Sequence, residues 1–357
     1  MAEREGFEPS EEETPFNGLA NRRTRPLCDL SSAAADDSMG FGPDDLAVPG
    51  STIAPPHPRS VPRMPATRLP IIGFPLARTA LEGVLRTALA EAGSPIQIEQ
   101  REARPHQLAD ALREVRDGED FAGALIASPH KEKAPALSDW LSDDARMSGA
   151  VNVLARTDGR LRGYNSDIDG VRAGLTSILP RVKGRWPRNA VVLGAGGGAR
   201  AVVAVLISSG FQHVMVFNRH LHRAEGLVSH FNRAARHMEL RARPWHDAII
   251  EAELARAEVL VNASGIGIEE GESPIPEELI PPDRFVLDLV LNRSSTPLMA
   301  AAKAQGGTVA NGQGTFLAST AATMKVLTGT APSADALRAA LATELGVPEE
   351  GLAVVGD

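Results

Sequence analysis

Short apolar runs alternate with longer stretches of helical spacing along most of the chain. Runs of aliphatic and β-branched residues predict strands at residues 69–73, 96–101, 123–127, 190–193, 214–217, 259–261, 285–289 and 308–309. Apolar positions that recur at helical spacing predict helices at residues 81–92, 107–115, 170–179, 199–207, 223–232, 318–327 and 332–345. Strands that alternate with helices are typical of a mostly parallel sheet covered by helices, so the sequence predicts an α/β fold.

Residues 1–66 do not follow this alternation. They are rich in proline, with acidic and Ser/Gly clusters and no sustained periodicity, which predicts a disordered N-terminal extension. The segment also resembles stretches that arise when a reading frame is assigned too far upstream. Translation from Met39 or Met64 and a genuine flexible tail are therefore two open interpretations.

Composition narrows the class of protein. A net charge of −8 argues against a general nucleic-acid-binding surface, and no apolar run approaches the roughly 18 residues that span a bilayer. The single cysteine, Cys28, excludes an internal disulfide and a cysteine-based zinc cluster, and the acidic start lacks the features of a signal peptide. We therefore expect a cytoplasmic protein with neither nucleic-acid nor membrane partners.

The segment AVVLGAGGGAR at residues 190–200 has the pattern of a strand, a tight turn and a helix start. Glycines in such a turn let the backbone approach a ligand closely, and the free amides of the helix N-terminus favour a pyrophosphate. A glycine-rich turn alone is weak evidence, but this one lies within an alternating β/α region. The predicted dinucleotide-binding residues are Gly194, Gly196, Gly197, Gly198 and Ala199.

The charges that follow the next predicted strand indicate which dinucleotide binds. NAD sites usually carry an acidic residue there, whereas this strand ends in Asn218 and Arg219, with Arg223 one helical turn further on. Two guanidinium groups favour the 2′-phosphate of NADP through charge-assisted hydrogen bonds. The alternative is a pair of solvent-facing arginines on a helix. We expect NADP.

Candidate chemistry precedes the nucleotide segment. Lys131 follows a predicted strand, Asp167 comes shortly before the next predicted helix, and Asn152 lies between them in a Gly-Ala-Val-Asn segment. A lysine and an aspartate at strand ends on one side of a sheet would suit proton transfer to and from a hydroxyl while hydride leaves the same carbon. By spacing alone such a pair is more often two solvated surface charges, and the asparagine more often holds a turn.

Several segments together resemble the shikimate dehydrogenase family. They are SPHKEKAPALSDWLSDDARMSGA, GAVNVLARTDGRLRGYNSDIDG, GAGGGARA, Asn218-Arg219, Asn262-Ala263 and the stretch from Asp288 to Leu298, in the family's order. The resemblance implies that Lys131 and Asp167 are the catalytic pair and that Asn152 binds a ring hydroxyl. It also implies a nicotinamide between a substrate domain and a Rossmann domain, with Asn262 and Gly312 in the cofactor site. None of the nine histidines falls at a family catalytic position. We expect His130 to pack or face solvent and assign no metal.

The chain departs from the family pattern in the substrate pocket. The family's H-S-x-S-P segment, whose serines bind the substrate carboxylate, aligns with Arg78-Thr-Ala-Leu-Glu82. Thr79 can replace the first serine, Leu81 cannot replace the second, and Arg78 is an alternative carboxylate partner. The family's N-V-T segment is Leu125-Ile-Ala127, and a usual tyrosine is Leu291. Ser319, in place of a glutamine, is expected to contact substrate, and His220 stands where a threonine is usual. These changes predict conserved chemistry with altered specificity.

The sequence thus predicts a two-domain oxidoreductase. We expect a substrate-binding domain at residues 67–168, to which a helix at 313–330 returns, a Rossmann domain at 169–312 and a tail at 331–357. The implied reaction is the reversible NADP-dependent reduction of 3-dehydroshikimate to shikimate in chorismate and aromatic amino acid biosynthesis, by a monomer or homodimer. The alternatives are a related enzyme on quinate or another cyclic polyol, and a non-catalytic NADP-binding sensor.

Overall fold

The computed structural model describes residues 67–76, 80–179, 187–349 and 352. The expectation for residues 1–66, and the candidate residues Arg78 and Thr79, lie outside this part of the chain. The described residues form two six-stranded sheets with helices packed on them, which confirms the predicted α/β class.

The first sheet is mixed. Its strands run in the order β2-β1-β3-β5-β6-β4, and β1 pairs in parallel with β2 and β3 while β5 pairs antiparallel with β3 and β6. The strands are β1 (Thr67–Gly73), β2 (Ile96–Glu102), β3 (Gly123–Ile126), β4 (Trp140–Leu141), β5 (Val153–Thr157) and β6 (Arg160–Tyr164). The β5–β6 hairpin follows Asn152 directly and ends just before Asp167, so it brings these two positions together.

Helices cover both faces of this sheet because successive strand residues point to opposite sides. Leu69 and Ile71 of β1 pack in one core with α1, α9 and α10, whereas Ile72 packs in another with α2. The helices are α1 (Ala80–Glu91), α2 (Leu108–Asp117), α3 (Asp143–Ser148), α9 (Gly312–Thr328) and α10 (Ala334–Leu345), with a short 3₁₀ turn η1 (Ala134–Leu137). The predicted tail helix α10 thus has a structural role, since it lies against α1.

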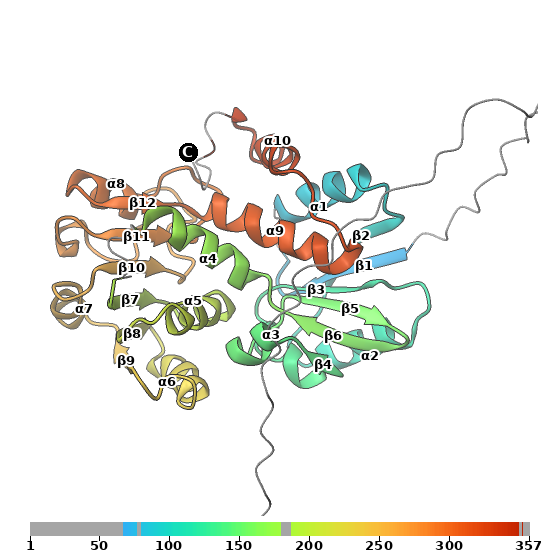
Figure 1. Cartoon of the computed structure of the whole chain (residues 1–357), viewed down its shortest axis with the longest axis horizontal. Coiled ribbons are helices and arrows are strands. Elements are labelled where there is room, and N and C mark those ends of the chain that lie inside the picture. Colours follow the sequence, from blue (N-terminus) through green and yellow to red (C-terminus); the bar gives the residue numbers. More distant parts are fainter. Residues whose placement is uncertain (1–66, 77–79, 180–186, 350–351, 353–357) are drawn as a thin grey trace, which may run out of the picture. The chain divides into compact units, whose positions relative to one another are not determined.

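The second sheet is wholly parallel, in the order β12-β11-β10-β7-β8-β9, which can be followed in Figure 1. Its strands are β7 (Asn189–Leu193), β8 (His213–Asn218), β9 (Glu239–Pro244), β10 (Val259–Asn262), β11 (Phe285–Asp288) and β12 (Thr308–Ala310). The strand order reverses between β7 and β10, as it does in a doubly wound nucleotide-binding sheet. In such sheets ligands bind at the carboxyl ends of the two strands that flank the reversal.

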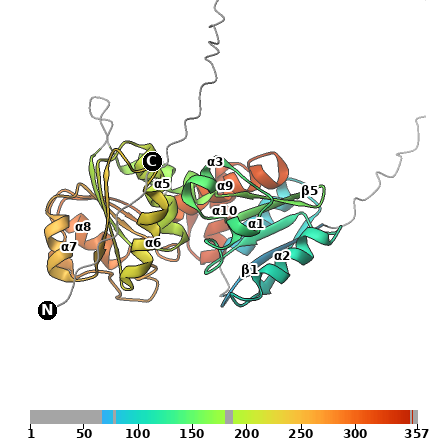
Figure 2. The same cartoon turned by 90° about the horizontal axis from the view of Figure 1, so that it is seen from below.

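The two faces of the second sheet carry different helices, as Figure 2 shows. Val192 of β7 packs in one core with α5 and α6, whereas the next residue, Leu193, packs in another with α7 and α8. The helices are α4 (Asp167–Ile178), α5 (Gly197–Ser208), α6 (Leu221–Phe231), α7 (Asp247–Leu254) and α8 (Pro297–Ala304), and a short 3₁₀ turn is η2 (Glu277–Leu279). None of the described helices has the length and apolar character that crossing a bilayer requires.

Two predicted helix starts were wrong. The helix expected from residue 170 begins at Asp167, and the helix expected from residue 318 begins at Gly312. The segment Gly312-Gln-Gly314, which lies outside the predicted helix, is the first turn of α9, because the side chain of Asn311 accepts a hydrogen bond from the Gln313 amide and caps the helix.

Candidate functional site

The predicted acid–base pair is formed in the structure. Lys131 lies in the turn after β3, and its Nζ is 2.6 Å from Oδ2 of Asp167. The two side chains are 23% and 20% exposed, so the pair is partly shielded yet open to a ligand. The expectation that both residues end strands was wrong for Asp167, which is the first residue of α4, with its amide bonded to Oδ1 of Asn165.

Neighbouring polar groups fix the carboxylate of Asp167. Its Oδ1 accepts a hydrogen bond from Asn152 Nδ2 at 2.9 Å and a long one from Ser319 Oγ at 3.5 Å. Asn152 also donates to Ser166 Oγ and accepts from the Ser166 amide, so its amide group is held on both sides. The geometry therefore gives Asn152 a positioning contact with Asp167, while its predicted contact with substrate stays a prediction.

Lys131 retains the capacity to bind a further group. Its carbonyl accepts from the Val151 amide, which fixes the backbone at this position. An ammonium carries three hydrogens, and Asp167 accepts one of them. The others are available to a substrate oxygen, as proton transfer to a carbonyl or from a carbinol requires.

The preceding histidine is structural. His130 is fully buried and its Nε2 lies 2.6 Å from the carbonyl oxygen of Ala103. This confirms that His130 packs, and the contact ties the turn that carries Lys131 to the segment after β2.

A cavity of 370 Å³ opens beside the pair, a volume within the range of small-molecule sites. Its polar lining is Ser128, Lys131, Asn152, Asp167, Ser319, Thr320 and Thr323. Its apolar lining is Ile71, Pro75, Leu76, Leu81, Leu125, Ile126, Ala127, Leu291 and Phe316. The positions at which the sequence departs from the family pattern, Leu81, Leu125, Ala127, Leu291 and Ser319, therefore all meet in one cavity.

The glycine-rich turn lies at the strand-order reversal, as a dinucleotide site requires. Gly194 has φ +113°, and a Cβ there would lie 2.5 Å from the carbonyl oxygen of Ala263, which follows β10. Gly196 is the N-cap of α5 with no side-chain cap, and a Cβ on it would meet no protein atom within 4 Å. The first helical hydrogen bond runs from the Arg200 amide to Gly196, so the amides of residues 197–199 precede the ladder and can receive phosphate oxygens.

Gly197 of this turn contacts Lys131. A Cβ on Gly197 would lie 2.9 Å from Cδ and 3.0 Å from Cβ of Lys131, whereas a Cβ on Gly198 would meet only Leu289 Cδ1, at an ordinary 3.6 Å. The side chain of Lys131 therefore runs along the start of α5, and the absence of a side chain at Gly197 sets its path.

We expect Gly197→Ala to lower kcat by about 10- to 100-fold, because a displacement of the order of 1 Å at a reacting group is enough to do so. Gly198→Ala is the matched control, since it adds the same methyl group one residue further along the same helix. Steady-state kinetics of the two variants check this, and equal kcat values would show that Gly197 does not determine the position of Lys131.

The predicted 2′-phosphate residues lie at the end of β8 and on α6. Arg219 and Arg223 are exposed, and Asn218 donates through Nδ2 to the carbonyl of His220. Arg223 is not free in this structure, because its Nη2 lies 3.2 Å from Oε1 of Glu132. Sequence reasoning missed Glu132, although its place directly after Lys131 could have indicated it.

Glu132 also contacts Arg200 of α5. Its Oε2 lies 3.5 Å from Nε of Arg200, whose Nη1 donates to the carbonyl of Ser148. Burial lowers the pKa of the Arg200 guanidinium, and the neighbouring charge of Glu132 acts in the opposite direction. Glu132 thus joins the lysine turn to both α5 and α6, the helices that flank the expected nucleotide.

Asn262 and Gly312 are near the nucleotide turn but have structural contacts of their own. Asn262 is buried and donates to the carbonyl of Ile266 and to Oδ1 of Asp288. Burial raises the pKa of Asp288, and Thr296 donates to its other oxygen. A Cβ on Gly312 would lie 2.5 Å from the carbonyl oxygens of Leu289 and Val290. Direct contact of Asn262 and Gly312 with the cofactor stays a prediction.

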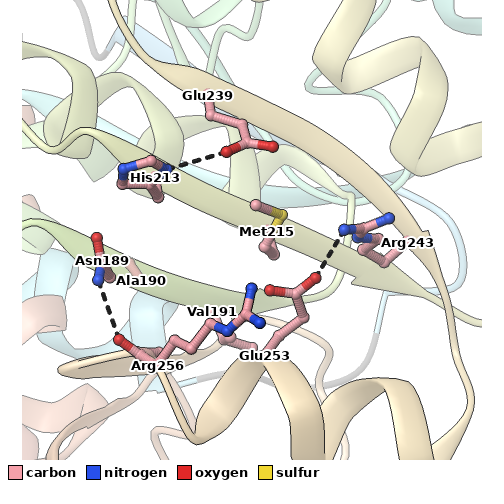
Figure 3. A pocket seen from close by; sticks show the side chains of 10 residues that line it. Asn189, Ala190, Val191, His213, Met215, Glu239, Arg243, Glu253 and Arg256 are labelled. Atoms are coloured by element: carbon pink, nitrogen blue, oxygen red, sulfur yellow. Dashed lines mark hydrogen bonds and ion pairs between the residues drawn. The ribbon is translucent and has the colours of Figure 1, made fainter.

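A second cavity, of 240 Å³, lies over the amino-terminal halves of β7 and β8 (Figure 3). Two pairs of its lining side chains contact each other, His213 with Glu239 at 3.0 Å and Arg243 with Glu253 at 2.8 Å. This second cavity is at the opposite strand ends from Gly194 and includes no member of the Lys131–Asp167 pair. The candidate site is therefore the cavity beside Lys131 and Asp167.

Comparison with known proteins places this geometry in a family. The family described as the shikimate dehydrogenase substrate binding domain matches residues 71–154, and the one described as shikimate / quinate 5-dehydrogenase matches residues 179–266. The chain is 34% identical over 281 residues to a protein of Thermus thermophilus named shikimate dehydrogenase (NADP(+)), with 78% of this chain and 99% of the relative covered. A protein of the same name from Methylocella silvestris is 35% identical over 257 residues, covering 71% and 87%.

Solved structures agree with the sequence comparison. The shikimate 5-dehydrogenase of Thermus thermophilus in complex with shikimate superimposes with a TM-score of 0.66 at 31% identity, covering 79% of this chain and all of that one. A second structure of that enzyme, with NADP(H) and shikimate, gives 0.64 at 30% identity, covering 78% and 99%. By the extent of these matches, and by the pair of Lys131 and Asp167 that the fold brings together, the chain belongs to the shikimate dehydrogenase family.

Proposed function

We propose that the protein catalyses the reversible NADP-dependent interconversion of a ring ketone and its carbinol, the reaction type in which 3-dehydroshikimate is reduced to shikimate. The observation that carries this proposal is the 2.6 Å contact between Lys131 Nζ and Asp167 Oδ2 on the wall of a 370 Å³ cavity. The relatives named above support the same chemistry.

The residues of the site have different roles in this reaction. NADPH, when bound, supplies the hydride that the carbonyl carbon receives. Lys131 gives its Nζ proton to the carbonyl oxygen as the carbon–hydrogen bond forms, so one ketone, one NADPH and one proton become one carbinol and NADP⁺. Asp167 orients Nζ and stabilises the ammonium from which the proton leaves, and Asn152 and Ser319 hold Asp167.

The chain has suitable groups for the cofactor. The uncapped start of α5 would receive the pyrophosphate, and Arg219 and Arg223 would face the 2′-phosphate beyond β8. We further propose that the enzyme acts in the cytoplasm in chorismate and aromatic amino acid biosynthesis, as a monomer or homodimer.

Turnover of ring alcohols by the full chain tests the proposal. With NADP⁺ as oxidant and shikimate, quinate and related ring polyols as substrates, we expect reduced cofactor to form at a rate that depends on substrate. NADP binding without turnover on any of them would instead support the sensor interpretation. The retained pair of Lys131 and Asp167 argues against that outcome, because binding alone needs no proton donor.

A further inference from the structure

We propose that the cavity beside Lys131 selects a ring substrate with an uncharged, apolar substituent in place of a carboxylate. This inference rests on the proposed reaction, the NADP-linked interconversion of a ring ketone and its carbinol, and specifies its substrate class. If it holds, shikimate is not the preferred substrate, and the role in chorismate biosynthesis proposed above does not hold. It concerns the part of the cavity wall formed by Leu76, Leu81, Leu125, Leu291 and Phe316, here called the apolar wall.

The apolar wall is continuous with the hydrophobic interior. Leu125 belongs to the core between the first sheet and α1, α9 and α10, and Leu76, Leu81, Leu291 and Phe316 pack against that core. Aliphatic and aromatic side chains offer a ligand no hydrogen-bond donor, so a charged group placed against them loses its hydration without compensation. A ring bearing a hydrocarbon or other uncharged substituent gains from the same contact.

The charges around the cavity also disfavour a carboxylate. Among the described residues that line it, Lys131 is the only cation, and Asp167 pairs with it at 2.6 Å. A carboxylate would therefore meet a lysine whose charge is already balanced, together with the negative charge of Asp167. Ser128 and Thr320 add hydroxyl groups to the lining, but these are neutral.

Part of the polar side of the cavity is committed to itself. Asn152 donates to Ser166 and Asp167, Ser319 donates to Asp167, and Thr323 bonds to Ser166. The hydroxyl of Thr320 has no hydrogen-bond partner in the part of the chain that the structure describes, so it remains for a ring hydroxyl. The site thus offers Lys131 to the reacting oxygen, neutral hydroxyl groups to the ring and the apolar wall to the substituent, which describes an alicyclic alcohol or ketone with an uncharged substituent.

A pair of substrates that differ at the carboxyl position, one charged and the other an uncharged methyl ester, tests this proposal. We expect kcat/KM for NADP-linked oxidation of the methyl ester of shikimate to exceed that of shikimate by about tenfold or more, since burying an unpaired charge is costly. A cyclohexanediol, which lacks the carboxyl group, one hydroxyl and the ring double bond, extends the series and is expected to be oxidised as well.

Substitutions in the apolar wall test whether this wall determines the substrate preference. Leu81→Ser combined with Leu125→Asn is expected to shift the preference toward shikimate, because it adds hydrogen-bonding groups where the carboxylate would lie. Leu345→Ser is the matched control, since Leu345 packs against the same core but does not line the cavity. Arg78→Ala tests the other carboxylate partner that the sequence offers.

The outcomes separate the two proposals. Turnover of shikimate that equals or exceeds turnover of its ester overturns the inference and leaves the proposed function intact. If Arg78→Ala then loses turnover of shikimate, the arginine is identified as the carboxylate partner. Absence of NADP-linked turnover with every ring alcohol overturns both. A preference for the ester that Leu81→Ser/Leu125→Asn reverses, and Leu345→Ser does not, supports the inference.

Discussion

Lys131→Ala is expected to lower kcat by about 10²–10⁴-fold, the usual contribution of a positioned general acid or base. The reason is that the carbonyl oxygen loses its proton donor, while the cavity and the start of α5 stay in place. Binding of NADPH, followed by its fluorescence, is expected to remain within about twofold of the original, because the nucleotide contacts lie on other residues.

Lys133→Ala is the control for this experiment. Lys133 follows in the same turn but is exposed, and its loss removes an equal charge without touching Asp167. We expect it to leave kcat unchanged. If Lys131→Ala also retained full kcat, the lysine would have no part in proton transfer and the proposed mechanism would be wrong.

The pairing of Lys131 with Asp167 could be anticipated from the sequence, but its geometry could not. Resemblance in several ordered segments indicated which lysine and aspartate to join, although the residues lie 36 positions apart. That Asp167 begins a helix was missed, although Asn165 and Ser166 directly before it are residue types that favour a helix start and the bond from the Asp167 amide to Asn165 Oδ1 is local. Glu132 was missed because its partners Arg200 and Arg223 come from distant helices.

Strongly apolar elements were predicted well, and elements stabilised by tertiary contacts were not. The buried strands β3 and β7 follow their sequence pattern closely. The outer strand β9 has the sequence Glu-Leu-Arg-Ala-Arg-Pro and was not predicted, although Leu240 and Ala242 alternate with charged residues and pack against the core. The last helix was predicted to begin only at residue 318, whereas α9 begins at Gly312, where the close carbonyls of Leu289 and Val290 require a glycine.

Departures from the family pattern indicated an altered specificity, and these departures meet in the cavity beside Lys131. Leu81, Leu125 and Leu291 are far apart in the sequence, and each taken alone is an ordinary core residue. Only the fold shows that they line one cavity with Lys131 and Asp167. The effect of these three residues on a ligand therefore depends on their lying together in one cavity, which a single sequence does not show.

Arg223 must exchange partners when NADP binds in the proposed way. In this structure it pairs with Glu132 at 3.2 Å, with the two side chains 47% and 30% exposed. Ion pairs this exposed contribute about 0–1 kcal/mol, whereas a hydrogen bond to a charged phosphate contributes about 1.5–3 kcal/mol. Arg223 is therefore expected to bind the phosphate in preference to Glu132. When it does, the turn that carries Lys131 and Glu132 loses its contact with α6.

Arg223→Ala is accordingly expected to weaken binding of NADPH by about 10- to 100-fold and to leave binding of NADH almost unchanged, because only the former has the 2′-phosphate. Glu132→Gln is expected to leave NADPH binding unchanged or to strengthen it by up to about fivefold, since it removes a competitor worth at most about 1 kcal/mol. Fluorescence titration of both reduced cofactors measures these constants.

Arg233→Ala supplies the matched control, because Arg233 is an exposed arginine just beyond the C-terminal end of α6, whereas Arg223 is near its N-terminal end. It is expected to leave both dissociation constants unchanged. An equal loss of NADPH and NADH binding in Arg223→Ala would show that the arginine supports the fold of α6 rather than the phosphate. No loss of either would assign the choice of cofactor to other residues, with Arg219, at the end of β8, the first to substitute.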